Sequence, residues 1–199
     1  MKITSRTTVS HQILSLLFAL GAASAAFGQN GPERATATLN GVQNGGLYDY
    51  TISLDNTGTV PIGTFWYAWI PGQFYLPSAP ASEAPPTGWT ASTPSLGGNY
   101  SIEYSASSSA DYLQPGSSLN FDFTSSDTPA TLAGDSSSYP GTPIGTSYLY
   151  EGAAFSDQGY QFVVQSIPEP SVAGLLTAGF LGLASARRWK LRRPGATTV

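Results

Sequence analysis

Apolar and polar residues alternate with a period of two in five separate stretches of the chain. Every second position is apolar, and the positions between are mostly Thr, Ser, Asp, Asn, Gln or Glu. Successive side chains of a β-strand point to opposite faces, so this pattern predicts strands with one buried side and one solvent-facing side. The predicted strands are 35–39, 48–54, 100–105, 119–124 and 160–165.

A sixth stretch, Phe65–Ile70, is apolar at every position and does not alternate. It predicts a strand that is covered on both faces, or one whose outer face is used for binding. In a regular strand Trp66 and Trp69 point to opposite faces, so we expect at most one of them to lie outside.

Turn residues separate these stretches, and helical periodicity is confined to the two ends of the chain. Pro-rich residues 77–86 and Ser-, Pro- and Gly-rich residues 125–146 are expected to be loops. The pattern predicts an all-β domain over 29–166, a single antiparallel β-sandwich of about seven to nine strands. An immunoglobulin-like or jelly-roll-like arrangement is expected.

The N-terminus has the order of features found in secretory signal peptides. Lys2 and Arg6 precede the apolar run 13–20, and small residues follow at Ala23-Ser24-Ala25. A second cleavage site is Ala26-Phe27-Gly28. Residues 1–28 are therefore expected to be removed by signal peptidase, the alternative being an ordinary buried N-terminal helix.

The C-terminus carries a second apolar run, 171–186, which predicts a transmembrane helix. Sixteen residues make a helix about 24 Å long, which is short for a bilayer core of about 30 Å. Residues 194–199 are expected to be a disordered tail. The run is followed by a basic cluster that should stop transfer through the membrane, and its members are Arg187, Arg188, Lys190, Arg192 and Arg193.

Charge is divided unevenly between the ends and the middle of the chain. Between residues 29 and 166 there are eleven acidic residues and one basic residue, Arg34, a net charge of −10. Basic segments stay on the cytoplasmic side, so this body is expected on the outer side of the inner membrane. Nucleic acid is an improbable partner for so acidic a surface, because its binding depends on Lys and Arg.

Few catalytic groups are available in the expected mature chain. There is no cysteine, and the single histidine, His11, lies in the segment expected to be removed. Serine and threonine then lack an imidazole to activate them. No enzyme activity and no cofactor are expected.

Paired carboxylates leave open a glycoside hydrolase, which is the less favoured alternative. The pairs available in sequence are Asp122 with Asp127, and Glu103 with Asp111. Solvated acids on strand faces and loops explain the same residues better.

Calcium binding by hard oxygen ligands is a further alternative. Asp55, Asn56 and Thr57 form one candidate set, and Asp127 with Asp135 form another. Ordinary Asx turns account for these residues more simply, so no metal site is expected.

Aromatic residues concentrate around the apolar stretch and could stack on sugar rings. This possibility makes an extracellular carbohydrate-binding module the main alternative function, and core packing is the competing explanation for the same residues. The possible sugar-stacking residues are Trp66, Trp69, Tyr75 and Trp89.

The C-terminal segment resembles the PEP-CTERM sorting tail of Gram-negative bacteria. The resemblance rests on Ile167-Pro168-Glu169-Pro170-Ser171 (motif 167–171), the apolar span and the basic cluster, together residues 167–193. It implies recognition of Pro168, Glu169 and Pro170 by an exosortase-type membrane enzyme. It also implies an inner-membrane precursor with a periplasmic body, which is then sorted to the cell surface or extracellular matrix. Such proteins are associated with exopolysaccharide, and a non-enzymatic structural or adhesive role is expected.

Overall fold

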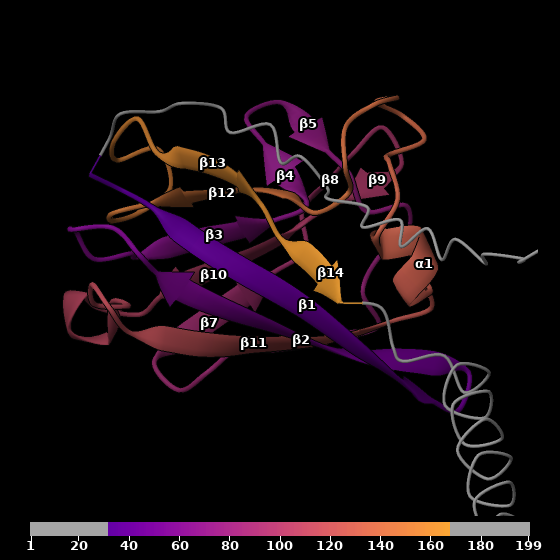
Figure 1. Cartoon of the computed structure of the whole chain (residues 1–199), viewed down its shortest axis with the longest axis horizontal. Helices are drawn as coiled ribbons and strands as arrows, with labels where there is room; N and C mark the ends of the chain where they lie inside the picture. The colour runs from indigo at the N-terminus through magenta and orange to yellow at the C-terminus, as the bar shows by residue number, and fades with distance from the viewer. Residues whose placement is uncertain (1–31, 168–199) are drawn as a thin grey trace, which may run out of the picture.

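The computed structural model describes residues 32–167, which form two five-stranded sheets packed face to face (Figure 1). The predicted signal peptide, the Pro168-Glu169-Pro170 motif, the apolar run and the basic cluster lie outside the described residues. Within 32–167, no helix is long and apolar enough to cross a membrane.

The described strands make two large sheets and two small hairpins. The first sheet has the order β14 (Gln165–Ile167), β1 (Ala35–Asn44), β2 (Leu47–Asn56), β11 (Ser118–Ser125), β6 (Ser82–Ala84). The second sheet has the order β13 (Tyr160–Val163), β12 (Thr146–Tyr150), β3 (Thr64–Tyr67), β10 (Ile102–Ala106), β7 (Trp89–Ser92). The hairpins are β4 (Trp69–Ile70) with β5 (Gln73–Phe74), and β8 (Ser95–Leu96) with β9 (Asn99–Tyr100).

The period-two alternation is confirmed as the burial pattern of the strands. In β1 the residues from Ala35 to Gly41 alternate between buried and exposed, and β2 pairs with it so that Leu39 faces Ile52. The two strands are joined by Gly45-Gly46, and Gly45 has a φ of 63°, which glycine adopts without steric cost. β11 continues the first sheet on the other side of β2, with Phe121 beside Ile52.

The core lies between the two sheets and is largely aromatic. Phe121 of the first sheet contacts three rings of the second sheet, with centroid distances of 5.4 Å to Phe65, 4.7 Å to Tyr104 and 5.1 Å to Trp89. Each fully buried aromatic side chain removes a large apolar area from water, so this contact between sheets is the main source of stability. Two packed sheets with a shared core confirm the prediction of a β-sandwich.

One strand pair departs from the expected antiparallel arrangement. β14 runs parallel to β1, with Thr38 beside Gln165 and Asn40 beside Ile167. Only Val164 separates β13 from β14, so the chain passes from the second sheet to the first without a turn. β14 therefore continues in the direction of β13, and in that direction it runs parallel to its neighbour β1.

The apolar stretch 65–70 is two short strands rather than one. Ala68 has a φ of 58°, in the left-handed region, and separates β3 from β4. The regular strand on which opposite faces for Trp66 and Trp69 depended is therefore not formed. Both side chains are buried, which agrees with the expectation that at most one lies outside. Their rings stack at a centroid distance of 4.2 Å and an interplanar angle of 25°.

The two predicted loops contain short regular elements. Residues 77–86 include β6, which forms an edge of the first sheet. Residues 125–146 include α1 (Pro129–Leu132), whose N-cap Thr128 accepts a 3.1 Å hydrogen bond from the amide of Thr131. A 3-10 helix, η1 (Ser109–Asp111), follows β10. These short elements explain why the described strands outnumber the seven to nine predicted.

Candidate functional site

The outer side of the first sheet is a flat surface of short polar side chains, here called the polar face. It exists because every second residue of three neighbouring strands is polar and points away from the core. Lys, Arg and aromatic side chains are missing from these positions. The polar face consists of Thr36, Thr38, Asn40, Asp49, Thr51, Ser53, Asp55, Ser118, Asn120, Asp122 and Thr124.

Hydrogen bonds between β2 and β11 hold the polar face in register. The Thr51 hydroxyl donates to Asp122 Oδ1 at 2.6 Å, and the two residues are directly opposite each other. One step along, the Ser53 hydroxyl donates to Asn120 Oδ1 at 2.9 Å. Such cross-strand pairs fix the positions of the side chains that solvent or a ligand would meet.

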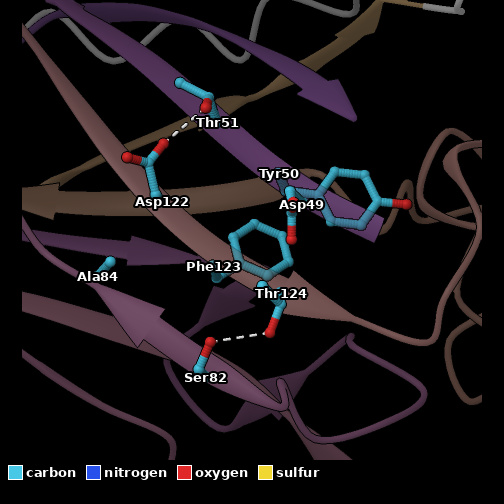
Figure 2. A pocket seen from close by; sticks show the side chains of 8 residues that line it. All are labelled: Asp49, Tyr50, Thr51, Ser82, Ala84, Asp122, Phe123 and Thr124. Atoms are coloured by element: carbon cyan, nitrogen blue, oxygen red, sulfur yellow. Dashed lines mark hydrogen bonds between the residues drawn. The ribbon is translucent and has the colours of Figure 1, made fainter. Parts of the chain in front are cut away.

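A hollow of about 280 Å³ lies on the polar face between β2, β11 and β6 (Figure 2). Asp122 faces the small side chain of Ala84 on β6, which leaves room above the sheet. Beside it, the hydroxyls of Ser82 and Thr124 are 2.8 Å apart. The hollow is lined by Asp49, Tyr50, Thr51, Ser82, Ala84, Asp122, Phe123 and Thr124.

The chemistry of the hollow is that of a hydrogen-bonding surface. Tyr50 and Phe123 also line it, and their buried rings stack at a centroid distance of 4.9 Å. Its rim carries two carboxylates, Asp49 and Asp122, and hydroxyls that both donate and accept. Asp49 Oδ2 accepts a 2.7 Å hydrogen bond from Asn44. This set of groups suits a ligand rich in hydroxyls.

The four possible sugar-stacking residues, Trp66, Trp69, Tyr75 and Trp89, are all buried, and none is more than 7% exposed. Trp89 Nε1 donates to the carbonyl of Asp111 at 3.0 Å, and the ring packs in the sandwich core. Tyr75 also belongs to the core. These residues therefore do not form an exposed platform on which a sugar ring could stack. Their aromatic area stabilises the fold instead.

The Trp66–Trp69 stack belongs to a second hydrophobic cluster beside the second sheet. Tyr148 and Tyr150 of β12 complete it, and Phe155 lies edge-on to Trp69 at a centroid distance of 5.8 Å. Burial, followed by the neighbouring Tyr148 and Asp157, raises the pKa of Tyr150 to about 12.

Asp157 holds the segment 151–159 that carries Phe155. Asp157 Oδ2 accepts a hydrogen bond from the Glu151 amide at 2.9 Å, and Oδ1 accepts one from the Gly159 amide at 2.6 Å. This carboxylate therefore has a structural task in closing the loop.

The carboxylate pairs considered for glycoside hydrolysis have separate surroundings. Asp122 is exposed on the polar face, whereas Asp127 is partly buried and accepts a 2.5 Å hydrogen bond from the Ser78 hydroxyl. Glu103 accepts from Ser92 on the neighbouring strand. Asp111 accepts from Ser108 at 2.7 Å, within the turn that contains η1.

One of the residues considered for calcium, Asn56, forms an Asx turn with Gly58. Asn56 Oδ1 accepts a 3.0 Å hydrogen bond from the Gly58 amide, and its Nδ2 donates to the carbonyls of Val60 and Leu113. Asp55 accepts a hydrogen bond from Ser118. Within residues 32–167, His, Cys, Asp and Glu side chains do not gather in groups of three that could hold a metal ion.

A polar cluster inside the sandwich could not be found from the sequence pattern. The Tyr50 hydroxyl donates to the carbonyl of Asp127 at 2.6 Å, while the Tyr67 hydroxyl and Asp127 Oδ2 are buried without a hydrogen-bond partner. Burial, followed by nearby Tyr50 and Asp127, raises the pKa of Tyr67 well above its ordinary value. The alternation identifies Tyr50 as inward-facing but not its contact with Asp127, and Tyr67 lies in the stretch that does not alternate.

No protein-family model matches the chain. No curated protein matches it either. Among solved structures, the GH20 exo-β-N-acetylglucosaminidase of Vibrio harveyi is 10% identical over 67% of this chain and 18% of its own, with a TM-score of 0.39. The chain thus spans under a fifth of that enzyme.

Two other solved structures match over almost their whole length. An uncharacterized Nocardia farcinica protein with an immunoglobulin-like fold is 14% identical over 65% of this chain and 98% of its own, with a TM-score of 0.37. The CBM3 of Hungateiclostridium clariflavum is 15% identical over 68% of this chain and 99% of its own, with a TM-score of 0.39. Likeness at this level does not identify an activity.

Proposed function

We propose that this chain is an exported, non-enzymatic β-sandwich protein, of immunoglobulin-like or jelly-roll-like type, that is sorted through its C-terminal tail. The tail holds the precursor in the inner membrane with the body in the periplasm. An exosortase-type enzyme then processes it at Pro168, Glu169 and Pro170, and the body reaches the cell surface or extracellular matrix. Its role there is structural or adhesive.

The observation that carries this proposal is that residues 32–167 form a sandwich without any residue of the proposed tail beyond Ile167. These residues supply both five-stranded sheets and the core between them. The last described strand, β14, ends at Ile167, and the next residue in the sequence is Pro168 of the sorting motif. Proline has no backbone N–H to donate to a sheet ladder. A body that has its own core is what a removable sorting tail requires.

The body itself supports a structural role more than a catalytic one. Residues 32–167 contain no Cys or His. The carboxylates discussed above have hydrogen-bond partners that account for their positions. A net charge of −10 between residues 29 and 166 keeps such a domain soluble and well hydrated outside the cell.

Polysaccharide binding is a second candidate function, and the hollow on the polar face favours it. Asp49, Thr51, Asp122 and Thr124 offer donors and acceptors spaced along two strands, which suits the hydroxyls of a sugar chain. The predicted tryptophans do not take part. Pull-down with exopolysaccharide of the producing cell separates the two roles, since a purely structural protein is not retained.

Replacement of Glu169 by alanine tests the sorting proposal. We expect full-length precursor to accumulate in the membrane fraction, because the charged residue of the motif is lost. Thr197→Ala is the control, since it lies past the basic cluster and outside the motif 167–171 and the apolar run. Immunoblots of membrane and medium fractions measure the outcome. Normal release of the Glu169→Ala protein refutes sorting through this motif.

A further inference from the structure

Exposed apolar side chains gather at one end of the first sheet. In residues 32–167 five large hydrophobic side chains are exposed, and three of them, Val42, Leu47 and Ile167, lie at this end. Val42 and Leu47 occupy the outer face of the β1–β2 hairpin; Val42 lies three residues before Gly45 and Leu47 directly follows Gly46. Residues 41–48 are called the hairpin tip below.

The chain leaves the sandwich beside this hairpin tip. β14 is parallel to β1 and places Ile167 next to Asn40, after which β1 runs on through Asn44 (Figure 1). Four further residues of an extended strand advance about 14 Å. The tip therefore projects past the point where the tail begins, in the direction in which β14 is heading.

The length of the tail brings the same end of the body to the membrane. The apolar run 171–186 begins four residues after Ile167, at Ser171. Four residues span at most about 14 Å even when fully extended. If the apolar run lies in a bilayer, Ile167 is within that distance of the bilayer edge, and the hairpin tip can reach the edge as well.

The hairpin tip itself has no charged side chain, and the nearest one, Asp49, lies at its base opposite Val42. From Ala35 to Tyr48 there is no charged residue, although residues 29–166 carry a net charge of −10. Anionic headgroups repel acidic surfaces within a Debye length. Tyr48 at the base of the tip is partly exposed, and tyrosine is enriched at the membrane interface.

We propose that the hairpin tip, together with Ile167, is a contact surface for the lipid bilayer and seats the body against the membrane while the tail is in place. This rests on the proposed function, because the tail must lie in the membrane. The contact orients the sandwich with the strand that precedes the sorting motif next to the lipid surface. It is lost when the tail is removed, because single exposed side chains bind a bilayer only weakly.

The absence of cysteine from the chain allows a direct test with the full chain. Val42→Cys, Leu47→Cys and Thr57→Cys are each labelled with an environment-sensitive NBD dye and reconstituted into phosphatidylethanolamine–phosphatidylglycerol vesicles. Thr57 is the control, because it is exposed and lies past the far end of β2, about 34 Å from Leu47. Lipids carrying a nitroxide near the headgroup quench dyes that touch the bilayer surface.

We expect several-fold stronger quenching at positions 42 and 47 than at position 57. Equal, weak quenching at all three overturns the proposed contact, as does quenching that appears only when the sorting enzyme is added. Ala178→Cys lies in the middle of the apolar run and reports on the tail by itself when it is read with lipids that carry the nitroxide near the end of an acyl chain. Quenching at 178 without quenching at 42 and 47 refutes the lipid contact alone, whereas no quenching at 178 refutes membrane insertion of the tail. Unchanged tryptophan emission of each labelled protein confirms that the fold is intact.

Discussion

Replacement of Asn56 by aspartate should destabilise the sandwich strongly at neutral pH. The Asn56 side chain is 1% exposed, and its amide group makes three hydrogen bonds to backbone. Nδ2 donates to the carbonyl of Val60 at 2.8 Å and to that of Leu113 at 2.9 Å, and Oδ1 accepts from the Gly58 amide at 3.0 Å. An aspartate keeps only the last of these bonds.

The magnitude follows from the bonds that are lost. Asn56→Ala removes three hydrogen bonds worth about 1 kcal/mol each, so about 3 kcal/mol is expected. Asn56→Asp removes two of them and points an anionic oxygen at two buried carbonyls. A buried charge without a partner costs several kcal/mol more, so Asn56→Asp should be less stable than Asn56→Ala. For a domain of roughly 140 residues the whole free energy of unfolding is about 7–20 kcal/mol, so the loss is readily measured.

The pH dependence gives a second check on the same variant. Burial among carbonyls raises the pKa of an aspartate at position 56 in the folded state above its unfolded value of about 3.9. Stability relative to the native chain is then highest below that pH and is lost as pH rises through the folded pKa. The difference between Asn56→Asp and Asn56→Ala should therefore shrink on acidification.

Urea unfolding of the full chain in mild detergent, followed by tryptophan fluorescence, measures these differences. Asn120→Asp is the matched control, because Asn120 is exposed and already acts as an acceptor for Ser53. Its effect should stay within about 0.5 kcal/mol. The reasoning fails if Asn56→Asp matches the native chain in stability. It fails equally if calcium stabilises that variant, because an added carboxylate would then be completing a cation site.

Two further predictions concern packing and titration. Gly41→Ala should lower the free energy of unfolding by about 1–3 kcal/mol, because a Cβ there would lie 2.3 Å from Tyr50 Cε1. Gly46→Ala is the control and should be nearly neutral, because a Cβ at that position has no atom within 4 Å. Equal losses of stability for the two variants in urea unfolding would contradict the contact with Tyr50. The folded protein should also lose stability as pH rises above 10, because burial raises the pKa of Tyr67 and of Tyr104 above their unfolded value of about 10. Each of these tyrosines lowers the free energy of unfolding by about 1.4 kcal/mol per pH unit in that range. Urea titrations that show the same stability at pH 10 and pH 11 would contradict the burial of the two side chains.

Much of the fold could be predicted from the alternation of apolar and polar residues. β1, β2 and β11 follow the period of two closely, because each has one face in the core and one in water. The break at Ala68 could not be predicted, since a left-handed residue is usually marked by glycine or asparagine and alanine gives no such signal. The parallel pairing of β14 depends on which sheet edge the chain meets, and that is a tertiary property.

The candidate site shows the same division between local and tertiary information. The sequence identified Trp66, Trp69, Tyr75 and Trp89 as notable, but not that the neighbouring chain buries them. Alternation placed Asp122 outward. It could not show that Ala84 lies opposite and leaves a hollow, because this depends on the register between β11 and β6.

The intact mass and both terminal sequences of the protein recovered outside the cell test the central claim most directly. The account predicts a mature chain that starts near residue 26 or 29 and ends near Pro168-Glu169-Pro170, without the apolar run or the basic cluster. Recovery of extracellular protein that still contains Trp189 would contradict sorting by removal of the tail.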